Sequence, residues 1–100
     1  MEVVLIHKTV GVLPPDMMKT GAEMGKQICT NPGQFVPNGK LTSSVAALNS
    51  YTVICLWEVP SLDALLPVME GMKNAGWVTD IIPVEQSLVW ISKLEKALTK

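Results

Sequence analysis

The stretch from Tyr51 to Leu65, YTVICLWEVPSLDAL, decides the fold because it holds a strand, its end and the start of a helix. Residues 51–59 are rich in β-branched and aromatic side chains, which is typical of a strand. Pro60 closes the strand, and Ser61 then stands where a helix N-cap oxygen is needed. The next helix has one apolar stripe, although Pro67 inside it should kink the helix or delay its start. The stripe consists of Leu62, Leu65, Leu66, Met69 and Met72.

Downstream of this unit, the chain returns as another strand. Asn74-Ala75-Gly76 predicts the end of the helix, and Trp77 to Val84 predicts a strand. Pro83 places that strand at a sheet edge, because proline cannot donate to a ladder. The tail has two interpretations. Either a helix begins at Ser87, with a stripe of Leu88, Ile91, Leu94 and Leu98, or the strand continues to Ile91 and residues 92–95 form a capping box.

Upstream, the same alternation of strands and helices continues. Residues 40–47 predict a moderately polar strand that turns at Asn49-Ser50 into the next one, so the region 46–53 forms a hairpin. Two clusters of helix-breaking residues, at 30–33 and 37–39, leave Gln34 to Val36 irregular. Residues 17–29 predict a helix, in which Gly21 and Gly25 allow a close approach to the sheet below. Residues 3–10 predict a strand buried on both faces.

The order of these elements is β-α-β-β-α-β followed by a terminal helix, which predicts an α+β fold of the ferredoxin-like kind. Right-handed crossovers place the first and third strands side by side in the middle of the sheet. Two helices then cover one face of the sheet, and the other face stays bare unless a second sheet covers it. One hundred residues without a linker, a repeat or a low-complexity tract predict a single domain, 1–100.

Charge and cysteine content exclude several classes of protein. Eight lysines, no arginine and nine acids give a net charge of −1, which disfavours nucleic acid and anionic membranes as partners. Cys29 and Cys55 do not form a CxxC pair, and two isolated thiols are typical of a reducing compartment. No apolar run reaches the roughly 18 residues of a membrane span, and the N-terminal residues do not resemble a signal peptide. We therefore expect a cytoplasmic protein.

Motif residues narrow the choice among βαββαβ families. The first loop lacks the CxxC of metal chaperones, the chain lacks the arginine of acylphosphatases, and the middle strands lack the paired aromatics of RNA-recognition domains. Residues 51–84 resemble the muconolactone isomerase-like members of the dimeric α+β barrel superfamily, in which a similar strand ends in an aromatic-acid-Val-Pro-Ser step. They also resemble small uncharacterised families whose last strand ends as Pro83-Val84 does. Membership implies a homodimer or an assembly of dimers, and a small hydrophobic ligand pocket.

Strand alternation selects the candidate site residues. Val3, Leu5 and His7 share one face of the first strand, and Ile54 and Leu56 form an aliphatic set that suits a helix-covered core. The remaining face of the third strand suits a pocket wall, which His7 would share, and small polar residues of the second strand would leave room for a ligand. The candidate ligand-binding residues are Thr42, Ser44, Tyr51, Cys55 and Trp57.

His7 is the candidate catalytic residue, because its usual pKa of about 6.5 suits proton transfer near neutrality. A histidine at a strand end can equally hydrogen-bond a neighbour or face water. Glu58 is expected to be solvated or to cap the next helix, and Cys55 to be an inert core thiol. The three tryptophans are expected at the barrel rim or the subunit contact. No spacing matches a metal site, and no cofactor is expected.

These residues predict a small-ligand-binding protein, with a cofactor-independent isomerase acting on a lactone or another carbonyl compound as its enzymatic form. The alternatives are a non-catalytic oligomeric or regulatory module and a cofactor-free or haem-type monooxygenase. An enzyme should hold a cavity at the barrel centre lined by His7. A structural module should fill the same volume with side chains such as Leu5, Val53 and Trp57.

Overall fold

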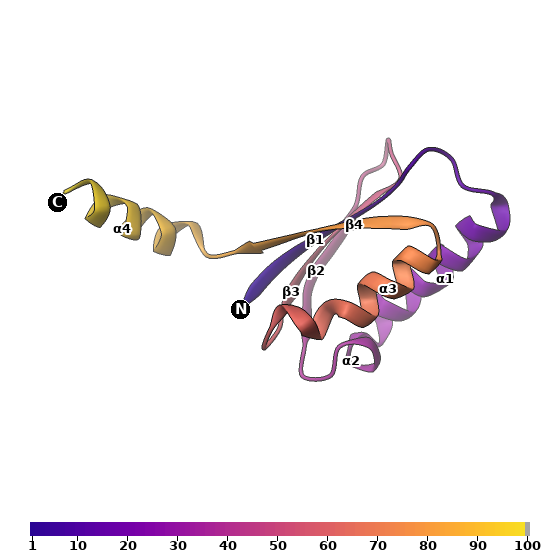
Figure 1. Cartoon of the computed structure of the whole chain (residues 1–100), viewed down its shortest axis with the longest axis horizontal. Coiled ribbons are helices and arrows are strands. Elements are labelled where there is room, and N and C mark those ends of the chain that lie inside the picture. The colour runs from indigo at the N-terminus through magenta and orange to yellow at the C-terminus, as the bar shows by residue number, and fades with distance from the viewer. Residues whose placement is uncertain (100) are drawn as a thin grey trace.

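The computed structural model describes residues 1–99 and has the predicted α+β, ferredoxin-like order of elements (Figure 1). The four strands are β1 (Glu2–Thr9), β2 (Lys40–Ala46), β3 (Thr52–Glu58) and β4 (Trp77–Val84). The helices are α1 (Pro15–Thr30), α2 (Pro32–Phe35), α3 (Leu66–Asn74) and α4 (Ser87–Leu98), with a 3₁₀ turn, η1 (Leu62–Leu65), before α3.

The strands form one antiparallel sheet in the order β2-β3-β1-β4, so the first and third strands lie in the middle as predicted. The central pair aligns Leu5 with Cys55 and His7 with Val53. On its other side, β1 aligns His7 with Thr79 of β4. Pro83 stands on the edge strand β4, where its missing N–H is tolerated. The pairing thus places Val53, His7 and Thr79 next to one another across β3, β1 and β4, on the same face of the sheet.

Helices α1 and α3 cover one face of the sheet, and that face is the opposite of the one predicted from the third strand (Figure 1). Cys55 and Trp57 are buried under the helices, whereas Ile54 is 39% exposed on the open face. Hydrophobicity could not distinguish the two faces, because both are apolar. The large indole of Trp57 fills the helix-covered side, together with a core that contains Val3, Leu5, Ile28, Val36, Leu65, Val68 and Met72.

Several local features differ from the sequence-based expectation. Residues 32–35 form the short helix α2 rather than an irregular segment, because Pro32 starts a turn that the Val36 N–H closes on the Pro32 carbonyl at 2.9 Å. Ser61 makes no side-chain cap hydrogen bond. Pro67 delays the α-helix, as predicted, because η1 precedes α3. The tail forms α4 from Ser87, so the interpretation with a strand to Ile91 is wrong.

A β-bulge in β2 changes which of its side chains face the helices. Leu41 is aligned with Trp57 and Ser43 with Leu56, so Thr42 is an extra residue on the β2 side. Beyond the bulge, Ser44 is aligned with Cys55 and shares its helix-covered face. Thr42 is exposed, and it does not share the environment of Ser44.

The last helix, α4, extends away from the sheet as an arm (Figure 1). It prolongs the direction of β4, and the molecule is consequently elongated, with principal extents of 56 × 30 × 19 Å. No residue of α4 is buried. Within residues 1–99, no helix is long and apolar enough to cross a membrane.

Candidate functional site

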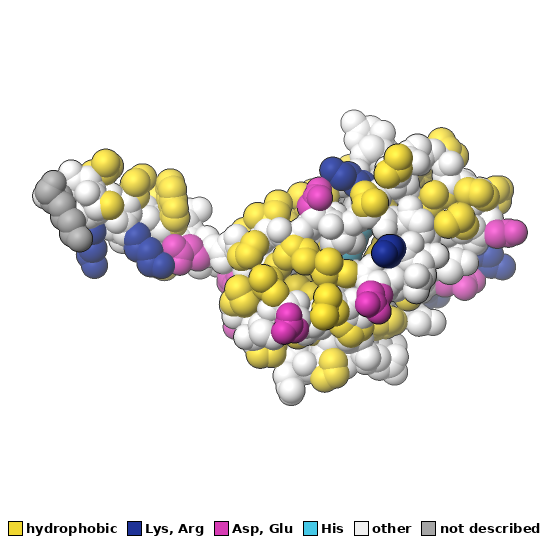
Figure 2. Space-filling model, in the orientation of Figure 1, with side chains coloured by type: hydrophobic (Ala, Val, Ile, Leu, Met, Phe, Trp, Pro, Cys, Tyr) yellow, Lys and Arg dark blue, Asp and Glu magenta, His cyan; other side chains and the backbone are white. Residues whose placement is uncertain are grey.

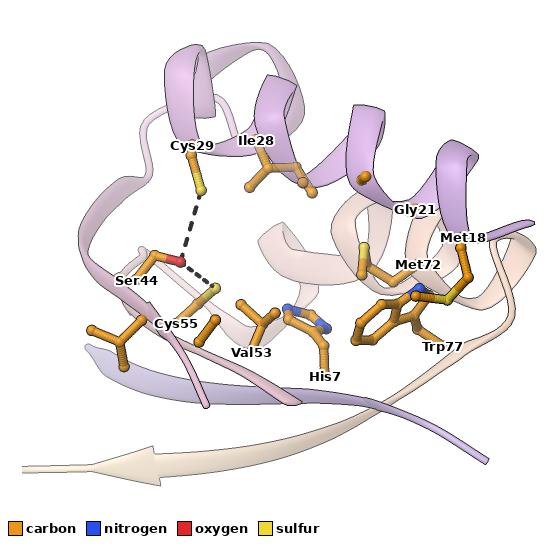
Figure 3. A pocket seen from close by; sticks show the side chains of 14 residues that line it. His7, Met18, Gly21, Ile28, Cys29, Ser44, Val53, Cys55, Met72 and Trp77 are labelled. Carbon is orange, nitrogen blue, oxygen red and sulfur yellow. Dashed lines mark hydrogen bonds between the residues drawn. The ribbon is translucent and has the colours of Figure 1, made fainter. Parts of the chain in front are cut away.

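A cavity of about 390 Å³ lies between α1 and the helix-covered face of the sheet (Figure 3). It is not at the centre of a barrel, where the sequence placed it, because His7, Val53 and Cys55, which form its wall on the sheet, face the protomer's own helices. Most lining atoms are apolar. The lining residues are His7, Met18, Gly21, Ala22, Gly25, Ile28, Cys29, Ser44, Val45, Ala46, Val53, Cys55, Met72 and Trp77.

Two glycines of α1 shape this cavity in opposite ways. A Cβ on Gly21 would lie 2.6 Å from Nε1 of Trp77, so the indole packs directly on the helix backbone there. A Cβ on Gly25, one turn further along, would meet no atom within 4 Å. Trp77 therefore closes one end of the space under α1, and the missing side chain of Gly25 leaves the space open. The close helix approach predicted from both glycines occurs at Gly21.

His7 contributes the buried imidazole of the cavity. Its Nδ1 shares a 2.7 Å hydrogen bond with Oγ1 of Thr79, the neighbouring residue on β4, and the residue is only 3% exposed. Burial lowers the pKa of His7 from 6.5 to about 4, so the ring is neutral at pH 7. Among the described residues, Nε2 of His7 has no hydrogen-bond partner. Either tautomer thus presents one unused hydrogen-bonding nitrogen, a donor in one and an acceptor in the other.

A second polar group lies at the β2 side of the cavity. Ser44 Oγ is 3.4 Å from Sγ of Cys55 and accepts a 3.7 Å hydrogen bond from Sγ of Cys29 (Figure 3). Burial raises the pKa of the Cys55 thiol, against the opposing effect of the Ser44 hydrogen bond. Cys55 is therefore protonated at pH 7 and a poor nucleophile. This cluster supplies weakly polar, uncharged groups to the wall.

The structure brings together three of the predicted site residues, His7, Ser44 and Cys55, on the cavity wall. The other three do not line it. The bulge leaves Thr42 exposed, and Tyr51 stands half exposed in the turn before β3. Trp57 is fully buried in the core.

The tryptophans do not lie where the sequence placed them as a group. Trp57 and Trp77 are buried, and within residues 1–99 their indole N–H groups have no hydrogen-bond partner. Trp90 is half exposed on the arm. The expectation of a position at the barrel rim or the subunit contact is therefore wrong for Trp57 and Trp77, which pack in the protomer's own core.

The sequence reasoning missed the helical half of the site. Met18 and Ile28 line the cavity from α1 and Met72 lines it from α3, and none of the three was predicted as a site residue. Gly25 was a usable signal, because a glycine in a helix sacrifices about 1 kcal/mol of helix propensity and often marks a space or a close contact. In the described part of the chain, no three His, Cys, Asp or Glu side chains gather as metal ligands.

Comparison with known proteins identifies the fold and no more. No family model matches the sequence, and no curated protein is significantly similar to it. Among solved structures, the chain is similar to SCO4226 from Streptomyces coelicolor A3(2), with a TM-score of 0.51 and 20% sequence identity. The match covers 87% of this chain and 99% of that one. At this identity the likeness establishes a shared small α+β fold built on a four-stranded antiparallel sheet.

Proposed function

We propose that this protein binds a small, uncharged, mainly apolar molecule in the cavity between α1 and the sheet. The observation that carries the proposal is the cavity itself, about 390 Å³ with a neutral buried imidazole on a mainly apolar wall. Binding sites of this kind combine a large apolar lining with a few polar groups that orient the ligand. His7 and Ser44 are those groups here, and a carbonyl or hydroxyl on the ligand would satisfy Nε2 of His7.

The charge of the cavity limits the ligand class. No lysine and no acid is among the lining residues, and His7 is neutral at pH 7. A carboxylate or phosphate entering this space would lose its hydration without gaining a counter-charge, which costs several kcal/mol. Lactones, ketones and phenols avoid that cost. We therefore expect neutral oxygen-containing compounds to be preferred over anions of the same size.

The same proposal includes a homodimer of the dimeric α+β barrel kind in a reducing, cytoplasmic setting. Apolar side chains on the open face of the sheet support the dimer, because water would otherwise contact them. Val45, Ile54, Val78 and Ile82 are each at least 39% exposed on that face. Both cysteines are free thiols, which a reducing compartment maintains.

An isomerase is the second candidate, and the His7–Thr79 contact favours it. Burial lowers the pKa of His7 to about 4, so its ring is a weaker base than the free imidazole that the sequence predicted, and the hydrogen bond to Thr79 has to supply its orientation. When Nδ1–H donates to the Thr79 hydroxyl, Nε2 carries a lone pair that faces the cavity. Nε2 would take a proton from the carbon beside a carbonyl, and the C–H electron pair would move into the enolate. In a β,γ-unsaturated carbonyl compound the enolate extends over the C=C, so return of the proton to the γ-carbon moves the double bond and re-forms the C=O with no cofactor. Deuterium exchange of 2-tetralone in D₂O, with His7→Gln as the comparison, tests this step.

Ligand binding is tested with coumarin, a neutral bicyclic lactone, and naphthalene, which has a similar shape and no carbonyl. NMR titration should show saturable shifts at His7 and Val53 with coumarin. Naphthalene should bind about fivefold more weakly, because one hydrogen bond contributes on the order of 1 kcal/mol. Gly25→Leu, which fills the cavity, should abolish both titrations. Saturable shifts that persist in Gly25→Leu, or none with any probe, would count against the cavity as a binding site.

A further inference from the structure

The arm helix α4 is amphipathic and has no apolar partner of its own. On a helical projection Trp90, Ile91, Leu94 and Leu98 share one face, and each is at least 40% exposed. The opposite face carries Lys93 and Lys96. Figure 2 shows hydrophobic side chains along one side of the arm and charged ones along the other. An exposed apolar face of this length is typical of a surface that binds another protein or a membrane.

The body of the same chain does not cover this face, because the segment before α4 directs the arm outward. Nε2 of Gln86 donates to both carboxylate oxygens of Glu2, at 3.1 and 3.2 Å. Nζ of Lys93 forms a 2.9 Å ion pair with Glu85. Within the described residues, the other side-chain hydrogen bonds of α4 stay inside the helix and its C-terminal end. These contacts hold the helix in line with β4 and away from its own sheet.

The area of the open sheet face indicates what the arm binds. Stable interfaces bury about 800 Å² on each partner. Strand spacing and rise give the open face of this four-stranded sheet a footprint of only about 450 Å². A helix of 12 residues presents a footprint of about 180 Å². If each copy gives one arm and receives one, the contact on each copy approaches the area that a stable dimer needs.

We propose that α4 is an exchanged arm, whose Trp90–Leu98 face packs on a second copy of this chain beside the paired sheets. The proposal rests on the dimer of the proposed function and adds the element that completes it. A membrane surface would cover the arm but would leave the open face of the sheet in water. The arm also carries little positive charge for anionic lipids, because Glu95 and the ion pair with Glu85 offset its lysines. A second copy covers both surfaces at once.

Trp90 reports the state of the arm directly. Trp57 and Trp77 are buried, whereas Trp90 is 54% exposed, so the quenchable tryptophan fluorescence belongs to Trp90. Acrylamide quenching should be strong in dilute protein and should fall as concentration rises. Its midpoint should coincide with the monomer–dimer transition seen by sedimentation. Trp90→Phe supplies the baseline from the other two tryptophans.

Paired substitutions separate the arm from the sheet contact. Leu94→Lys should raise the dimer dissociation constant about tenfold or more, because one leucine is lost from each of two arms. Val89→Lys also replaces an aliphatic residue of α4 by lysine, but off the apolar face, and should alter the dissociation constant less than about twofold. Ile54→Lys on the open sheet face should also dissociate the dimer. Coumarin titrations on the same variants follow the cavity separately.

Four results would contradict the exchanged arm or the dimer on which it rests. Low quenching in a protein that sediments as a monomer would show that the arm folds on its own body, and the arm proposal would be wrong. Protection of Trp90 by vesicles of phosphatidylcholine and phosphatidylglycerol, without protection by dimerisation, would assign the arm to a membrane instead. A dimer sensitive to Ile54→Lys but not to Leu94→Lys would leave the sheet contact standing and remove the arm from it. A monomer at all concentrations would overturn both the sheet contact and the exchanged arm. Failed coumarin binding alone would overturn only the ligand proposal.

Discussion

His7 is the residue whose environment has the clearest measurable effect. Burial lowers its pKa to about 4 in the folded protein, whereas the unfolded chain binds the proton near pH 6.5. Between these values the unfolded state holds more protons, so stability falls as pH falls. The stability lost between pH 7 and pH 5 should be about 2 kcal/mol.

Urea unfolding of the wild type and of His7→Gln at both pH values checks this prediction. The glutamine side chain does not titrate, so most of the pH dependence in this window should disappear in the variant. The chain has a single histidine, and its NMR titration should therefore give one midpoint near pH 4. Identical pH dependence in the two proteins would show that His7 is solvated rather than buried.

Substitution of Gly21 and of Gly25 by alanine should change the stability of the protein in opposite directions, although both residues lie on α1. Gly25→Ala should stabilise the protein by about 1 kcal/mol, because alanine is the better helix former and the added Cβ meets open space. Gly21→Ala has the same helix preference but puts its Cβ 2.6 Å from the Trp77 indole, so it should destabilise. Thermal unfolding measures both, and near-UV circular dichroism should change only for Gly21→Ala. Equal effects would show that Trp77 does not pack on α1.

At the residue scale, sequence reasoning found the part of the site that side-chain chemistry and strand alternation reveal. His7 and Cys55 were placed on one wall by counting alternate positions, and the register confirms that they share a face. The prediction of which face the helices cover was wrong, because Ile54 and Cys55 are both apolar and alternation gives no preference between them. Thr42 was grouped with Ser44 because a bulge depends on the paired strand and has no sequence signal of its own.

At the level of elements, the bulge in β2 predicts that the strand tolerates deletion of one residue, Thr42. Removing Thr42 leaves Leu41 aligned with Trp57 and Ser43 with Leu56, so the two sides of the strand keep their faces. The deletion should cost about 1 kcal/mol or less, because no buried side chain moves. Deleting Ile54 from β3 should instead unfold the chain, since every residue on one side of it would turn to the wrong face.

Urea unfolding of the two deletion variants measures the difference. A folded protein with Ile54 removed would contradict the register described here, and an unfolded one with Thr42 removed would show that the bulge is structurally required.

Element types were largely predictable because each has strong local signals. The strand at residues 77–84 was predicted at its observed bounds, and Pro67 marked the delay before α3 correctly. The tail was ambiguous between strand and helix, because Leu88, Ile91 and their neighbours are apolar all along. The structure resolves it as a helix from Ser87, and α2 was missed because four residues are too few to show a helical period.

For the whole molecule, the open face of the sheet predicts that a single charged substitution on it weakens the dimer. Ile54→Lys should shift sedimentation toward the monomer and leave the ligand cavity intact, because Ile54 points away from α1. Val12→Lys changes a residue that is 82% exposed in the loop before α1 and should not alter assembly. The fold could be predicted from the sequence at this scale, whereas assembly remains a prediction because it depends on a second chain.

The outward direction of α4 has a consequence for crowded solutions. An arm that seats on a neighbour closes a pair only when the neighbour returns its own arm to the first molecule. A neighbour that passes its arm to a third molecule leaves one vacancy at each end, and the chain of molecules can then grow without limit. Short closed pairs should therefore compete with linear polymers at high concentration, and stiffness at residues 85–86 should set the balance between them.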